Sequence, residues 1–169
     1  MARTGIDWTN NTQRCFQHRN NWHEEKKVGG IMFKRFIEKM AGKASLVNIK
    51  FDLDNLRQFF PHSPSAASKH LFGLIENITF ARENGMSDTD ISAAIQNKFA
   101  SLQPELQQIT TAVHSLVSAS AAGDTTLVAQ LDAVINRIFR ETTGAPLDTR
   151  KISLLARIAM SKNMRCGQR

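Results

Sequence analysis

The sequence contains no tyrosine and only two cysteines, Cys15 and Cys166. The other aromatic residues, phenylalanine and tryptophan, are space-filling apart from the indole nitrogens. Two cysteines cannot build the disulfide framework of a small secreted protein, so a reducing compartment is the simpler expectation. No apolar run approaches the roughly 20 residues of a membrane-spanning helix, and the N-terminus lacks the apolar core of a secretory signal. We therefore expect a cytoplasmic protein without a transmembrane segment.

Short catalytic motifs are also missing. There is no Gly-x-Ser-x-Gly turn, no glycine-rich phosphate loop and no His-Glu-x-x-His pair. His70 has no acid–base partner nearby, because Glu76 falls off its helical face. Cys15, His18 and His23 lie close together, but a structural zinc site needs four ligands and their spacing matches no zinc finger. We expect no enzymatic activity, no metal site and no cofactor, although a catalytic site assembled from distant residues would escape this search.

The charge of +7 is unevenly distributed over the 169 residues. Residues 1–50 have a balance of +6, residues 51–148 a balance of −5, and residues 149–169 a balance of +6. Basic ends suit a nucleic acid, an anionic membrane surface or an acidic protein partner. They could equally fold over the acidic middle of the chain, so charge alone does not choose among these partners.

The main positive signal is helical periodicity. Apolar residues recur every three to four positions from Met32 to Ala159, as in amphipathic helices. This predicts an all-α fold, a compact bundle of about six to seven helices with short connections. The expected helices are 31–43, 54–60, 63–84, 87–99, 104–122, 124–143 and 149–162. We expect one helical domain at 31–162, a disordered basic tail or leader at 1–30, and a frayed basic C-terminus at 163–169.

One stretch breaks this periodicity. After a helix expected to stop near Gly42, four apolar residues alternate with polar ones, namely Val47, Ile49, Phe51 and Leu53. A period of two is typical of a β-strand, but a lone strand leaves its edges without partners. We therefore expect an extended connector here.

The centre of the chain carries clear helix start and stop signals. Pro64 suits the first turn of a helix, and Asn84-Gly85 suits its end. Ser87 and Asp90 have the spacing of a capping box, which starts the next helix. The segment 63–99 is therefore expected to form two helices whose apolar stripes cover each other.

This hairpin also resembles the first part of a helix-turn-helix, with a glycine turn at Gly85 and a short second helix. The resemblance covers about a fifth of the chain and implies a recognition helix at 104–116. That helix would present Glu105, Gln107, Gln108 and Thr111. Glutamine can read adenine in the major groove. However, the helix has no Lys or Arg to contact phosphates, which favours an ordinary helical hairpin.

Two basic amphipathic helices are the remaining candidates for function. In the first, the residues expected to bind a partner are Phe33, Lys34, Arg35, Phe36, Lys39 and Met40. In the second, the residues suited to nucleic acid are Arg150, Lys151, Arg157 and Lys162. The sequence therefore favours a non-catalytic interaction or regulatory protein that binds a protein through a helical groove or basic face. Nucleic-acid binding by the basic ends is the alternative, and either helix would also suit peripheral contact with an anionic membrane.

Overall fold

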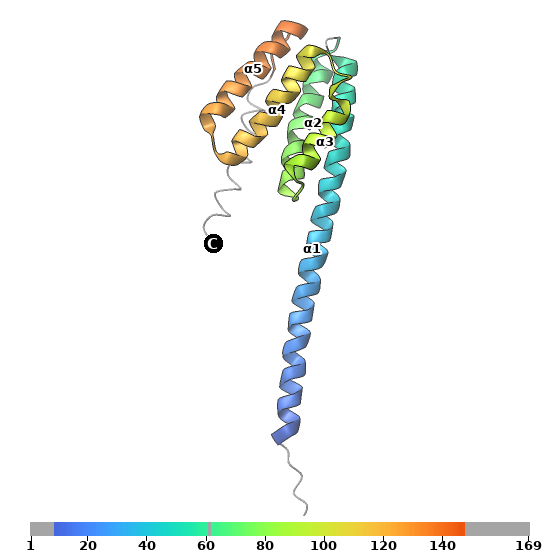
Figure 1. Cartoon of the computed structure of the whole chain (residues 1–169), viewed down its shortest axis with the longest axis vertical. Coiled ribbons are helices and arrows are strands. Elements are labelled where there is room, and N and C mark those ends of the chain that lie inside the picture. The colour runs from blue at the N-terminus through green and yellow to red at the C-terminus, as the bar shows by residue number, and fades with distance from the viewer. Residues whose placement is uncertain (1–8, 61, 148–169) are drawn as a thin grey trace, which may run out of the picture. The chain divides into compact units, whose positions relative to one another are not determined.

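The computed structural model describes the backbone of residues 9–60 and 62–147, and the side chains of residues 31–60 and 62–147. These ranges contain five helices and no strand (Figure 1). The helices are α1 (Thr9–Phe59), α2 (Pro64–Glu83), α3 (Asp88–Phe99), α4 (Pro104–Ala122) and α5 (Thr125–Thr143). The predicted all-α class is confirmed. The predicted count of six to seven is wrong for this part of the chain, because α1 replaces two expected helices. The helix expected at 149–162 lies outside the described residues.

The chain divides into two units, Met1–Glu38 and Lys39–Arg169, and α1 has residues in both. α1 begins at Thr9, inside the segment for which the sequence predicted a tail or leader. The predicted limits of the helical domain, at residues 31 and 162, stay predictions.

One hydrophobic core occupies the second unit. It takes residues from the last part of α1 and from all four later helices. The predicted apolar stripe of α2 is confirmed, since Leu71, Leu74, Ile75 and Ile78 are at most 1% exposed. In α3, Ile91, Ala94 and Ile95 are buried and Phe99 is partly buried against the same core. Both stripes therefore pack into one core, together with residues of α1, α4 and α5. That each stripe directly covers the other stays a prediction.

The extended connector expected after Gly42 is wrong, because residues 44–59 continue α1. Ile49 and Leu53, four residues apart, are buried in the core, whereas Val47 and Phe51, also four apart, are exposed. Two helical stripes on opposite faces of one helix together give alternation along the sequence. The apparent period of two therefore arises from two overlapping apolar stripes, each with the helical period of about 3.6 residues.

Gly42 does not end the helix. It is buried inside α1, and a Cβ at this position would lie 2.8 Å from Cγ of Met86. The absence of a side chain lets the α2–α3 turn approach α1 closely.

The predicted helix ends in the centre of the chain are confirmed. The Ser87 hydroxyl accepts a hydrogen bond from the Asp90 amide, and the Asp90 carboxylate accepts one from the Ser87 amide. The Ser87 hydroxyl also donates to the Asp90 carboxylate at 2.6 Å. This bond and the one from the Ser87 amide lower the pKa of Asp90 below its usual value, and the charge of Lys39 adds to this lowering. α4 ends at Gly123 with a φ of 77°, a left-handed conformation that suits glycine.

Arg82 joins three of the helices. Its guanidinium donates to the Ser118 hydroxyl of α4 at 2.8 Å and pairs with Asp88 of α3 at 2.6 Å.

No helix among the described residues combines the length and apolar character needed to cross a membrane.

Candidate functional site

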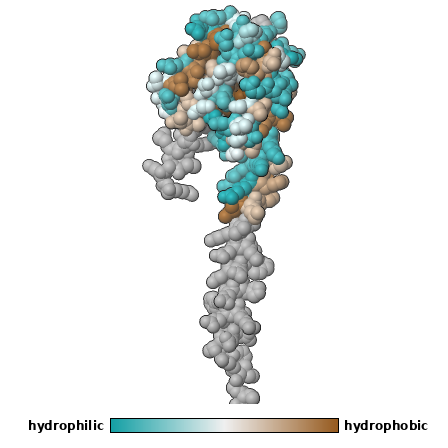
Figure 2. Space-filling model, viewed as in Figure 1, coloured by the Kyte–Doolittle hydropathy of each residue, from teal (hydrophilic) through white to brown (hydrophobic). Residues whose placement is uncertain are grey.

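The exposed apolar side chains gather on α1. Among the described residues, every exposed large hydrophobic except Phe80 and Leu127 belongs to this helix. In the first unit these residues are Ile31, Met32, Phe33, Phe36 and Ile37. In the second unit they are Met40, Val47 and Phe51. Figure 2 shows brown and tan residues on the surface of the coloured part of α1.

The residues that the sequence predicted for partner binding belong to this surface. Phe33 is 67% exposed and Met40 is 53% exposed, so both side chains are accessible to a partner. Lys34 forms an ion pair with Glu38 at 3.9 Å, one helical turn away. The basic residues assigned to nucleic acid, Arg150, Lys151, Arg157 and Lys162, lie outside the described residues, and the side chains of Cys15, His18 and His23 do too.

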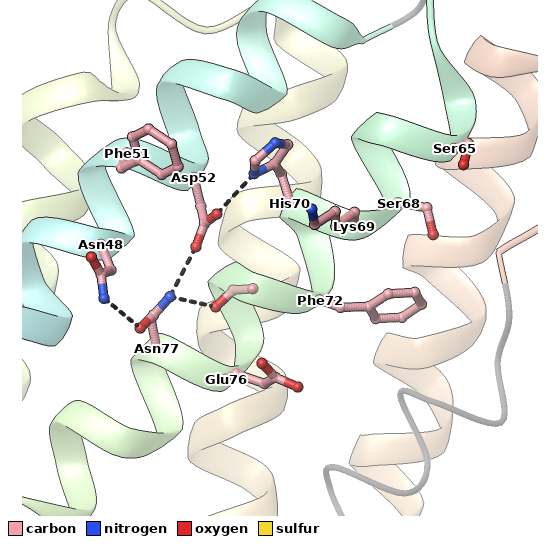
Figure 3. Close-up of a pocket in the computed structure, with 11 residues that line it drawn as sticks. Asn48, Phe51, Asp52, Ser65, Ser68, Lys69, His70, Phe72, Glu76 and Asn77 are labelled. Carbon is pink, nitrogen blue, oxygen red and sulfur yellow. Dashed lines mark hydrogen bonds and ion pairs between the residues drawn. The ribbon is translucent and has the colours of Figure 1, made fainter.

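A groove of about 930 Å³ lies between α1 and α2. At its floor is Asp52, a buried carboxylate on α1 that is 6% exposed. One carboxylate oxygen is 3.0 Å from Nδ1 of His70, and the other accepts a hydrogen bond from the Asn77 amide at 2.9 Å. Figure 3 shows Asp52 between these two α2 side chains. The three residues tie α1 to α2.

Aromatic rings fix the position of His70. The Phe59 ring stacks on the imidazole with a centroid distance of 5.8 Å, and the Phe51 ring meets it edge-on at 6.0 Å. Both phenylalanines belong to α1, so the histidine of α2 is held by apolar contacts as well as by Asp52. Phe51 therefore has two roles, as a groove wall and as part of the exposed surface of α1.

A glycine provides the space for the carboxylate. A Cβ on Gly73 would lie 2.9 Å from an Asp52 carboxylate oxygen. The Asn77 amide also donates to the Gly73 carbonyl oxygen at 2.9 Å, which keeps it aimed at Asp52. Gly73 is thus the position at which α2 comes close enough for this network.

The groove holds an acid–base pair without a nucleophile beside it. Within the described residues, the only hydrogen bond of His70 is the one to Asp52. Ser65 and Ser68 line the groove, but neither is hydrogen-bonded to the imidazole. No group of three His, Cys, Asp or Glu side chains in this part of the chain is arranged for a metal ion. The contacts that the structure shows make Asp52 and His70 a structural link between α1 and α2.

Of the four residues implied by the helix-turn-helix resemblance, Gln107 and Thr111 make hydrogen bonds within the chain. Glu105 and Gln108 are exposed on α4. The Gln107 amide donates to the carbonyl oxygens of Phe99 and Leu102, which secures the loop before α4. Gln107, Gln108 and Thr111 line a second groove, of about 550 Å³, together with residues of α5. Base reading by this face stays a prediction.

Sequence reasoning missed the partner of His70. Asp52 is 18 positions away and falls in the stretch interpreted as extended. A helical interpretation of that stretch would have placed Asp52 between Ile49 and Leu56 on the buried stripe. A carboxylate at a buried helical position was thus the available signal.

No family model matches the chain, and no curated protein or solved structure is significantly similar to it. Neither a fold nor a site can therefore be transferred from a relative.

Proposed function

We propose that this protein is a non-catalytic interaction protein that binds a protein partner through the exposed apolar surface of α1. The observation that carries this proposal is the concentration of exposed apolar side chains on one helix, while the other described helices expose only Phe80 and Leu127. Scattered apolar residues are ordinary on protein surfaces, but apolar residues gathered on one element mark a binding surface.

The size of these side chains makes the surface costly to leave in water. Removing one Phe, Met or Val side chain from water contributes about 1.5–3 kcal/mol. Phe33, Met40 and Val47 are each more than half exposed, so covering them would supply a large part of a binding free energy. The charged residues beside them, including Arg35 and Lys39, would form the polar rim of such an interface.

The nucleic-acid alternative has less support among the described residues. α4 contains no Lys or Arg, so it lacks the cations that supply most affinity for phosphates. The basic residues 150–162 lie outside the described part of the chain, and their binding to nucleic acid stays a prediction. Peripheral membrane contact and a cytoplasmic location, expected from the basic helices and the two cysteines, also stay predictions.

The test is co-purification of the full chain with its bound partners at low and at moderate salt. Two variants, Phe33→Asp in the first unit and Met40→Asp in the second, place a charge on the α1 surface. Phe80→Asp and Leu127→Asp are matched controls, because they place the same charge at exposed apolar sites on α2 and α5. We expect a protein partner that survives moderate salt, is lost in both α1 variants and is kept in both controls.

A different pattern would overturn the proposal. Retention of DNA or RNA with a steep dependence on salt, unaffected by either α1 variant, would favour nucleic-acid binding instead. A protein partner that is kept in the α1 variants would place the interaction on another surface.

A further inference from the structure

We infer that the partner contributes an amphipathic helix with an acidic edge, which packs along α1 as in a two-stranded coiled coil. This inference rests on the proposed function and specifies the chemistry of the partner. Its first basis is the spacing of the exposed residues in the second unit. Met40, Ala44, Val47 and Phe51 alternate at intervals of four and three and are all exposed. This is the 3.5-residue repeat of a coiled-coil seam.

The same spacing continues backwards along the sequence. In the first unit, Phe33 and Ile37 have these intervals and are exposed, but Ile31, Met32 and Phe36 are exposed there as well, so this unit presents a wider apolar face. At 100° per residue, the four positions of the second unit fall within an arc of about 60°. A stripe this narrow is typical of a helix–helix seam, whereas a helix that lies in a membrane surface or packs in a globular core presents a wider apolar face.

The exposed stripe cannot be covered by the core that α1 already serves. Ile49, Leu53 and Leu56, on the opposite face of α1, are at most 1% exposed and pack into the hydrophobic core of the second unit. A helix needs one apolar stripe to join its own bundle, so the second stripe is available for a separate partner. The partner is therefore expected to bind without displacing any core residue.

The lysines beside the exposed stripe indicate the charge of the partner helix. Lys39, Lys43 and Lys50 follow one edge of the stripe, and none of them forms an ion pair within the described residues. The lysines at 43 and 50 are one heptad apart and occupy a position that flanks a coiled-coil seam. Glutamates at the facing positions of a partner helix would pair with them. A second copy of this chain would bring further lysines instead.

The experiment uses the full chain and two synthetic peptides of three heptads. Both peptides carry Leu and Ile at the seam positions; the acidic peptide has Glu at the flanking positions and the basic peptide has Lys. Affinity is measured by fluorescence anisotropy of the labelled peptide. We expect the acidic peptide to bind at least about tenfold more tightly than the basic one, and Val47→Asp to weaken it by about tenfold or more.

One test variant and two matched controls distinguish binding at the seam from general attraction to a basic protein. The double variant Lys43→Glu/Lys50→Glu should reverse the preference, so that the basic peptide binds more tightly. Arg137→Glu/Arg140→Glu changes the net charge equally on α5, where both side chains are exposed, and should leave the preference unchanged. Leu127→Asp is the control for Val47→Asp.

Four results would overturn the inference. Equal binding of both peptides, or equal loss in the α5 charge variant, would mean that the lysine edge does not select the partner. Tighter binding to vesicles of phosphatidylserine and phosphatidylcholine than to the acidic peptide, lost in Val47→Asp, would identify a membrane surface. A dimer in analytical ultracentrifugation that Val47→Asp dissociates would identify a second copy.

The proposed function fails separately from this inference. If a co-purified protein depends on Met40 but the acidic peptide does not compete with it, α1 is the binding surface and the partner is not an acidic helix. If no protein depends on Met40 or Phe33, the α1 surface itself is not the interface.

Discussion

Asp52 shows how one side chain can determine the arrangement around it. Its carboxylate is almost fully buried, and both of its oxygens have partners on α2. Burying a carboxylate without partners is costly, so His70 and Asn77 are needed to keep it inside. Gly73 is needed as well, because any side chain there would enter the space of the carboxylate. The buried network therefore needs four residues from two helices, namely Asp52, His70, Gly73 and Asn77.

Because α1 and α2 approach closely at Gly73, the effect of Gly73→Ala on the free energy of unfolding should depend on whether Asp52 is present. Alanine inside a helix is favoured over glycine by about 1 kcal/mol, but crowding in a packed site costs about 1–3 kcal/mol. We therefore expect Gly73→Ala to lower the free energy of unfolding by about 1 kcal/mol. In an Asp52→Ala background the carboxylate is absent, and Gly73→Ala should raise the free energy of unfolding. Urea unfolding of the four proteins of this cycle measures both effects.

A second prediction at this scale concerns His114 on α4. Its pKa is lowered by burial and by the charge of Arg82, while Asp88 acts in the opposite direction. Its Nε2 atom is buried without a hydrogen-bond partner in the described residues, so protonation there brings no compensating bond. As the pH falls below the ordinary histidine value of 6.5, the unfolded chain binds the proton first. The folded state should therefore lose stability below that pH, until the lowered pKa of His114 is passed.

The measurement is the free energy of unfolding between pH 7.5 and pH 5. His114→Gln should flatten this dependence, whatever its effect at pH 7.5. Gln108→Ala is the control, because Gln108 is exposed on the same helix and does not titrate in this range, so the slope should stay as in the original protein. An unchanged slope in His114→Gln would assign the acid sensitivity to another group.

At the scale of the element, α1 explains which parts of the fold the sequence could predict. The helices α2 to α5 each have one apolar stripe and clear terminal residues such as Pro64, Ser87 and Gly123, so their existence and bounds were predictable. α1 has two stripes on opposite faces, and their overlap between Val47 and Leu53 imitated the alternation of a strand. The Asp52–His70 pair was missed for the same reason, because it needs that stretch to be helical. Exposure of the predicted residues Phe33 and Met40 could not be deduced from periodicity, which marks apolar faces without showing what covers them.

The start of α5 allows a prediction about helix capping. The Asp124 carboxylate accepts a hydrogen bond from the Leu127 amide at 2.9 Å. Replacing it by alanine leaves that amide without this acceptor and should cost about 1 kcal/mol in the free energy of unfolding. Ser63 occupies the same position before α2 but makes no side-chain capping bond, so Ser63→Ala should change stability by only a few tenths of a kcal/mol. Equal losses in the two variants, measured by urea unfolding, would contradict this assignment of the caps.

At the scale of the whole molecule, the two units differ in what supports their helical backbone. In the second unit, α1 is held by a stripe of buried residues that includes Ile49, Leu53 and Leu56. In the first unit, none of the described side chains from Ile31 to Glu38 is buried. An isolated helical segment is marginal in water, because most helical stability in proteins comes from tertiary packing. The hydrogen bonds of one continuous helix should therefore open at very different rates along its length.

Amide hydrogen exchange can measure this difference directly. Amides in the core segment Leu71–Ile78 should open only by global unfolding, whereas those in 31–38 should open by local fraying, exchanging on the order of 100-fold faster or more. Amides near Leu53 should resemble the core segment, since that part of α1 is packed. Protection of 31–38 that equals the core value and falls on dilution would mean that a second copy covers this surface. Protection that equals the core value at every dilution would mean that contacts within one chain support the first unit, and the distinction between the units would be wrong.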